Sequence, residues 1–105
     1  MHVQVNTDSR TPGSADLDQS VRTIVESKLG RFAEFITRVE VHLMDENSPA
    51  RSTGNDKRAL IEVRPRGLDP ISASDHAASY DTALRSAADK MRTQLDTITG
   101  KLGRR

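Results

Sequence analysis

Apolar and polar residues follow two different periods along this chain of 105 residues. A period of two, with every second residue apolar, is typical of a half-buried strand. Four short segments show it, at residues 2–6, 39–43, 59–64 and 71–74. A period near 3.6, typical of a helix with one buried face, follows residue 16 and again residue 79. The pattern therefore predicts the element order β-α-β-β-β-α.

The first helical segment has the clearest apolar stripe. Its members are Leu17, Val21, Ile24, Val25, Leu29, Phe32, Phe35 and Ile36. We expect Asp16 to cap this helix, with Gln19 in the capping-box position. Lys28 falls inside the stripe, so its ammonium must reach around the stripe to water or meet a carboxylate. Arg22 lies four residues before Glu26, a spacing that predicts an ion pair along the helix.

The second helical segment repeats the pattern at Tyr80, Leu84, Ala87, Met91, Leu95, Ile98 and Leu102. We expect Ser79 to be its N-cap. Gly100 and Gly103 are expected to fray its other end, which leaves residues 100–105 as a frayed tail. A separate strip of this helix alternates in charge, through Arg85, Asp89, Arg92 and Asp96. Such a strip favours a solvated face of ion pairs over a nucleic-acid surface.

The strands and helices can be assembled in one way that buries every stripe. The last three strands can form an antiparallel meander, joined by a turn at residues 65–67 and by residues 45–57, which we expect to be a mobile loop. The first strand reaches the second through a helix, so these two should be parallel. Each strand has one apolar face, so both helices must cover the same side. We expect an α+β fold, a four-stranded mixed sheet with two helices on one face, as a single domain over residues 1–105.

Composition narrows the function classes. Acidic and basic residues nearly cancel, 15 against 16, for a net charge of +1. This balance excludes disorder driven by charge and argues weakly against a strongly basic nucleic-acid binder. The absence of cysteine excludes a disulfide scaffold, a thiolate zinc site and a cysteine nucleophile. No apolar run approaches the roughly 18 residues of a membrane span, and no secretion signal is visible, so we expect a cytoplasmic protein without membrane contact.

Candidate chemistry is sparse. The chain lacks a glycine-rich phosphate loop, a nucleophile elbow and a paired-histidine metalloprotease motif. We expect His42 on the polar face of the sheet and His76 just after the fourth strand, both as solvated side chains. Asp45 and Glu46 form an acidic pair without the ligand spacing of a calcium loop. The sequence therefore predicts no catalytic residue, metal ligand, cofactor or small-molecule substrate.

Three segments, taken with the order of the elements, carry a resemblance to a known family. They are residues 22–32 (RTIVESKLGRF), residues 37–47 (TRVEVHLMDEN) and residues 87–95 (AADKMRTQL). With them, nearly the whole chain resembles the short hibernation-promoting factor and ribosome-associated inhibitor family of bacteria, the sigma-54 modulation protein family. That family has a β-α-β-β-β-α fold similar to the double-stranded-RNA-binding fold.

The resemblance implies a non-catalytic protein of ribosome hibernation. It implies binding to the 30S ribosomal subunit and the 70S ribosome through 16S rRNA, near the decoding centre, where the protein would silence translation under stress or in stationary phase. Lysine and arginine would contact rRNA phosphates. The candidate rRNA-binding residues at matching positions are Arg22, Lys28, Arg31, Lys90 and Lys101, with Arg92 one residue from a further basic position of the family.

Two departures from the family pattern change the expectation. Residues 96–99 (DTIT) stand where the family carries a basic run, and Ala78 and Ser79 stand where the family has an aspartate. These departures predict a weaker RNA surface, because each lost phosphate contact weakens binding and lowers the slope of its salt dependence. The chain also stops before the dimerisation domain of the longer family form, so we expect a monomer or a weak homodimer. The alternative that stays open is a protein-interaction module that kept the fold and lost most of its RNA binding; a small enzyme that uses His42 and His76 is kept only as a check.

Overall fold

The alternating strand segments pair into one mixed sheet. In the computed structural model, which describes residues 1–8, 13–46 and 54–102, the elements are β1 (His2–Thr7), α1 (Ala15–Leu29), the 3-10 turn η1 (Gly30–Phe32), β2 (Ile36–Asp45), β3 (Lys57–Pro65), β4 (Ile71–Ala77) and α2 (Tyr80–Leu102). The sheet order is β1-β2-β3-β4, with β1 parallel to β2 and the other pairs antiparallel. The predicted α+β fold and strand directions are confirmed.

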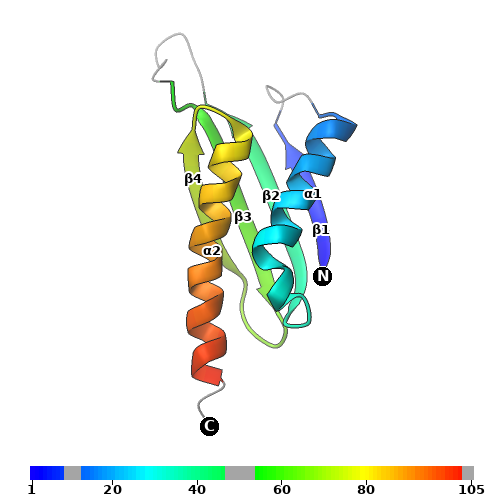
Figure 1. The fold of residues 1–105 in the computed structure, drawn as a ribbon, viewed down its shortest axis with the longest axis vertical. Helices are drawn as coiled ribbons and strands as arrows, with labels where there is room; N and C mark the ends of the chain where they lie inside the picture. The colour runs from blue at the N-terminus through cyan, green and yellow to red at the C-terminus, as the bar shows by residue number, and fades with distance from the viewer. Residues whose placement is uncertain (9–12, 47–53, 103–105) are drawn as a thin grey trace.

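The two helices cover one face of this sheet and run side by side in the same direction (Figure 1). Beneath them, three directly opposed pairs of β2 and β3 are completely buried: Val39 with Val63, Val41 with Ile61, and Leu43 with Ala59. The helices add their own buried stripes: Val21, Ile24, Val25 and Leu29 of α1, and Leu84, Met91 and Leu95 of α2. Each described strand and helix contributes to this core, and we retain as a proposal that residues 1–105 form a single domain.

The start of α1 differs from the expectation. Ser14 is the N-cap: its backbone is extended, and its hydroxyl accepts a hydrogen bond from the Leu17 N–H at 3.0 Å. The expected capping box of Asp16 and Gln19 is therefore wrong. Asp16 lies in the first turn, where its negative charge favours the positive end of the helix dipole. Gln19 instead donates a hydrogen bond to the Thr23 hydroxyl.

The end of α1 also differs. The apolar stripe predicted a helix through Ile36, but α1 ends at Leu29 and is followed by η1. A 3-10 turn has three residues per turn, which keeps Phe32 on the buried side three positions after Leu29. Ile36 is the first residue of β2. The apolar spacing here thus comes from a short turn followed by a strand, two patterns that together imitate a helical stripe.

The strands around residues 45–57 extend further than their alternation predicted. Asp45 pairs with Lys57 in the ladder, and the hydrogen bond from Lys57 to Asp45 raises the pKa of the Lys57 ammonium. This extension of β3 gives β4 a partner as far as Ala77. His76 therefore lies within β4, and its expected place after the strand is wrong. Residues 47–53 of the expected mobile loop 45–57 lie outside the described residues.

Helix α2 begins as expected and ends later. The Ser79 hydroxyl accepts a hydrogen bond from the Thr82 N–H at 3.2 Å, which confirms the predicted cap. Residues 100–102 remain helical, so the expected fraying at Gly100 is wrong; residues 103–105 lie outside the described part of the chain. A glycine inside a helix costs only about 0.5–1 kcal/mol relative to alanine. The preceding residues of α2 are sufficient to carry the helix past it.

We expect Ile24→Ala and Leu84→Ala each to lower the free energy of unfolding by about 2–5 kcal/mol. Ile24 is 3% exposed and Leu84 is 1% exposed, so truncation of either side chain leaves a cavity under the helices. Urea unfolding followed by circular dichroism measures the loss. Ser27→Ala, at an exposed position of α1, should change stability by no more than about 0.5 kcal/mol. Equal losses in all three variants would contradict the placement of the core.

Candidate nucleic-acid interface

The six candidate bases lie in separate places around the helices. Lys28 in the last turn of α1 and Arg31 in η1 both face α2. Arg22 faces β1, and Lys90 faces β4 on the opposite side of α2. The remaining two, Arg92 and Lys101, form no ion pair with any residue that the structure describes. The structure therefore brings Lys28 and Arg31 together and separates them from Arg22 and Lys90.

Lys28 finds the carboxylate that its position in the apolar stripe required. Its Nζ atom lies 2.8 Å from the Oδ1 atom of Asp89 in α2. The Lys28 side chain is 23% exposed and the Asp89 side chain 57% exposed. The lysine stem thus covers apolar surface between the helices while its charged end lies at the rim, as expected for a snorkelling side chain.

Arg31 makes the next bridge between the same elements. Its guanidinium pairs with Asp96, which lies two helical turns beyond Asp89 on α2. The guanidinium carbon also lies 4.6 Å from the centre of the Phe32 ring, within the range of a cation–π contact. Both partners of the ion pair are more than half exposed. The Arg31 guanidinium is therefore held in place yet remains accessible from solvent.

The members of the alternating strip on α2 do not pair with one another as their charge pattern indicated. Asp89 and Asp96 pair with α1 and η1, and Arg85 pairs with Asp81 in the preceding turn, 3.2 Å away. Arg92 lies three residues after Asp89 and four before Asp96, so it shares their side of α2. We call this set the α1–α2 seam; its members are Lys28, Arg31, Asp89, Arg92 and Asp96.

Arg22 has a different partner from the predicted one. Its Nε atom lies 2.7 Å from the Oδ2 atom of Asp18, one turn earlier, rather than pairing with Glu26. That hydrogen bond raises the pKa of the Arg22 guanidinium above its ordinary value. A second nitrogen donates to the Val3 carbonyl at 2.9 Å. Arg22 thereby connects α1 to β1, an edge strand of the sheet, which the helix spacing alone could not show.

Lys90 is engaged at the other edge of the sheet. Its Nζ atom donates to the Ser74 carbonyl at 3.1 Å and lies 3.3 Å from the Asp75 carboxylate. One turn further along α2, Gln94 donates to the Ser72 carbonyl at 2.9 Å. Both contacts occupy outward-facing carbonyls of β4, and such cover protects an edge strand against pairing with another chain.

A second group of basic residues, which the alternation within the strands did not single out, lies on the face of the sheet that the helices leave uncovered. The uncovered face of the sheet carries Arg38 directly opposite Arg64, and one row further Glu40 directly opposite Glu62. Like charges in direct opposition repel, and each arginine is compensated along its own strand: Arg38 lies 2.9 Å from Glu40 and Arg64 lies 3.8 Å from Glu62. The strand register that places Arg38 opposite Arg64 and Glu40 opposite Glu62 is set by the pairing of β2 with β3. These oppositions therefore become visible only in the assembled sheet.

The histidines do not converge. His42 lies on the uncovered face of β2, 3.8 Å from Glu40, which confirms its expected place on the polar side. His76 lies two strands away in β4 and contacts Glu46. In the described ranges, no group of three or more His, Cys, Asp or Glu side chains is placed to share a metal ion. None of the helices in those ranges is long and apolar enough to cross a membrane.

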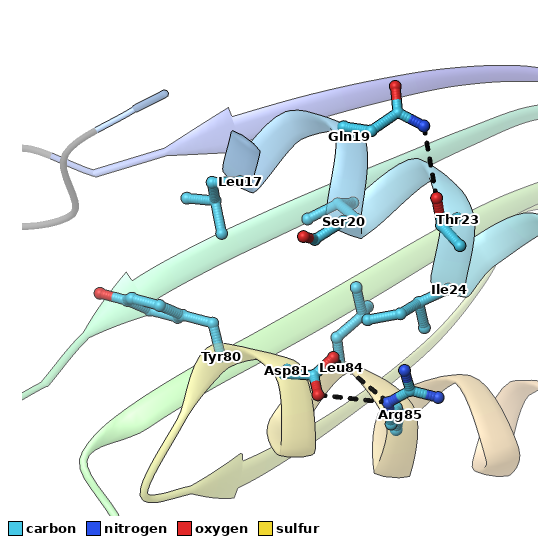
Figure 2. Close-up of a pocket in the computed structure, with 10 residues that line it drawn as sticks. Leu17, Gln19, Ser20, Thr23, Ile24, Tyr80, Asp81, Leu84 and Arg85 are labelled. Carbon is cyan, nitrogen blue, oxygen red and sulfur yellow. Dashed lines mark hydrogen bonds and ion pairs between the residues drawn. The ribbon is translucent and has the colours of Figure 1, made fainter. Parts of the chain in front are cut away.

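A groove of about 580 Å³ separates the first halves of α1 and α2. Figure 2 shows Leu17 and Tyr80 at one end of this groove, and Ile24 and Leu84 deeper between the helices. The Asp81–Arg85 ion pair borders it. The α1–α2 seam lies beyond this groove, because Lys28 follows Ile24, the last α1 residue of its lining, by one turn. Its wall is mainly apolar, and its charged border belongs to α2.

Comparison with known proteins gives a family and a shared fold. The family model described as "Sigma 54 modulation protein / S30EA ribosomal protein" matches residues 13–103. A ribosomal subunit interface protein from Coxiella burnetii superposes with a TM-score of 0.70 at 19% identity, over 95% of this chain and 99% of that one. The N-terminal domain of Protein Y from Thermus thermophilus gives 0.66 at 20% identity, over 93% and 99%. No curated protein sequence matches.

The edge contact at Asp75 predicts a pH dependence of stability. The hydrogen bond from the His76 N–H, with a smaller effect of Lys90, holds the pKa of Asp75 below its ordinary value of 3.8. A carboxylate with a lowered folded-state pKa stabilises the fold above its unfolded pKa, and this contribution is lost as the pH falls. Between about pH 5 and about pH 2 we expect Asp75→Asn to lose less unfolding free energy than the wild type.

Urea unfolding at a series of pH values and constant ionic strength measures this difference. Asp69→Asn is the matched control, because Asp69 is exposed in the β3–β4 turn and forms no ion pair with a described residue. It should keep the pH dependence of the wild type. If Asp75→Asn and the wild type lost stability in parallel, the contact between Asp75 and its two donors would contribute nothing to folding.

Proposed function

This chain belongs to the Sigma 54 modulation protein / S30EA ribosomal protein family, and from that premise we propose that it is a non-catalytic, ribosome-associated protein. It binds the 30S subunit, alone and within the 70S ribosome, near the decoding centre, and it silences translation under stress or in stationary phase. The proposed contacts are to 16S rRNA, and the proposed location is the cytoplasm. This function requires no cofactor and no small-molecule substrate.

The convergence of bases at the α1–α2 seam is the observation that supports this proposal most directly. Lys28 and Arg31 lie at its rim, and Arg92 lies on the same side of α2 without an ion pair to any described residue. An arginine guanidinium can hold a phosphate through two parallel hydrogen bonds, and a lysine ammonium acts as a point charge. The seam therefore offers three cations to an RNA backbone: the accessible Arg31, Lys28, and Arg92, which has no ion pair with a described residue.

The other three candidates have different proposed roles. Lys101 lies exposed near the end of α2, which extends past the end of α1 (Figure 1), and we propose that it makes an additional phosphate contact. Arg22 and Lys90 donate hydrogen bonds to strand carbonyls. We propose that these two mainly stabilise the edges of the sheet and contribute to RNA binding only secondarily.

The protein-interaction module remains a second candidate function. The observation that favours it is the internal pairing of Arg22, Lys28, Arg31 and Lys90, each with a carboxylate of this chain. Capture of partners from lysate, before and after nuclease treatment, distinguishes the two candidates. Partners that disappear with the RNA support ribosome binding. Partners that persist after nuclease treatment support the interaction module.

The double variant Arg31→Gln/Arg92→Gln should bind 30S subunits at least roughly tenfold more weakly than the wild type, because each charge-assisted hydrogen bond contributes roughly 1.5–3 kcal/mol. The slope of log affinity against log salt should become shallower by about 1.4–1.8, the contribution of two phosphate contacts. Co-sedimentation with 30S and 70S particles across a range of salt concentrations measures both quantities.

The control is Arg58→Gln/Arg85→Gln, which removes the same positive charge from places outside the seam. Arg58 lies in β3 opposite His76, and Arg85 is already paired with Asp81. The control should retain a salt slope close to that of the wild type. Identical behaviour of the two double variants would show that net charge, rather than the seam, determines binding. Absence of the wild-type protein from ribosomes even at low salt would rule out the proposed function.

A further inference from the structure

In the α1–α2 seam, Lys28 and Arg31 are each paired with a carboxylate of α2. We propose that Asp89 and Asp96 determine the affinity of this surface, because they compete with RNA phosphate for Lys28 and Arg31. This inference rests on the proposed function, and it adds a specific pair of residues that limits binding. Under this proposal, Asp89 and Asp96 are part of the RNA-binding site.

The geometry supports direct competition. Each cation has its own carboxylate: the Lys28 ammonium lies 2.8 Å from Asp89, and the Arg31 guanidinium pairs with Asp96. Carboxylate and phosphate oxygens accept hydrogen bonds from these groups in the same way, and the arginine fork matches both anions. A phosphate approaching the seam therefore requires the hydrogen-bond positions that the aspartates already hold.

A displaced aspartate would continue to oppose binding. Asp89 and Asp96 belong to α2 on either side of Arg92, and their side chains are 57% and 51% exposed. A carboxylate that loses its cation to phosphate stays on the same helix face, close to the phosphate, and repels it. Each aspartate thus weakens RNA binding twice, first by occupying the cation and then by repelling its ligand.

A purely structural role explains these pairs less well. Ion pairs between exposed side chains contribute little to folding stability. The helices are already joined by buried apolar residues, including Ile24, Leu29 and Leu84. Removal of the aspartate charges should therefore leave the fold intact, which allows their effect on binding to be measured separately.

The experiment compares Asp89→Asn/Asp96→Asn with Asp16→Asn/Asp69→Asn. Asparagine keeps the size of the side chain and removes its charge, so both variants raise the net charge equally. Asp16 and Asp69 are exposed and form no ion pair with a described residue, so the control frees no cation. Binding to purified 30S subunits is measured across salt concentrations, and thermal unfolding verifies that each variant is folded.

We expect Asp89→Asn/Asp96→Asn to bind 30S subunits roughly tenfold more tightly than the control, the change expected from several surface charge interactions. Its slope of log affinity against log salt should stay close to that of the control, because Lys28 and Arg31 neutralise the same phosphates in both proteins. In the Arg31→Gln background, Asp96→Asn should increase affinity by less than it does beside Arg31, because no cation is released and only the repulsion of phosphate by Asp96 is removed. If the double variant fails to fold, Asp96→Asn alone, at the more exposed bridge, tests the same prediction.

Three results separate this inference from the proposed function. Equal affinities of the two double variants would overturn the competition while leaving ribosome binding intact. If no form bound ribosomes, a synthetic RNA duplex would be the second probe. Tighter duplex binding by Asp89→Asn/Asp96→Asn alone would then support the competition without the ribosomal function. Equal duplex binding by all forms, or none, would overturn the competition as well.

Discussion

Burial of a single face of the sheet determines where both helices lie. The opposed pairs of β2 and β3 that begin with Val39 and Val63 are shielded completely from solvent, and removal of their apolar surface from water drives both helices to that side. Two helices on one face must lie next to each other, as Figure 1 shows. The charged flanks of α1 and α2 are then brought together whatever their signs. The candidate site is thus a consequence of how the core is covered.

That arrangement gives a physical meaning to the near-zero net charge. Four of the six candidate bases pair with carboxylates within the chain, and Arg38 and Arg64 of the uncovered face are compensated along their own strands. The charges are therefore organised into local pairs, and the total of +1 does not describe any one surface. What distinguishes the seam is that its two pairs join α1 and η1 to α2, and that Arg92, which forms no ion pair with a described residue, lies on the same side of α2.

Predictions from the sequence failed where two local solutions compete. Ser14 and Asp16 are both good N-caps, and the backbone conformation that brings the Ser14 hydroxyl to the Leu17 N–H decided between them. The spacing from Leu29 to Ile36 fits a continued helix as well as a 3-10 turn followed by a strand. The sequence prediction placed His76 outside β4, because a polar residue at this position gives no strand signal. The strand reaches Ala77 because β3 supplies a pairing partner there. In the last two cases the deciding contacts are strand pairs with β3, which lie outside the local sequence window.

Periodicity was enough to predict the order of the elements and the α+β class, and the cost of burying a charge predicted that Lys28 needs a carboxylate or water, because both are local properties. The packing of the helices on the sheet determines that Asp89 supplies this carboxylate, that Asp96 holds Arg31, and that Lys90 turns away toward β4. These residues are far apart in the chain, and their contacts exist only after both helices pack on the same face. Which bases stay available to a partner is therefore a property of the assembled fold.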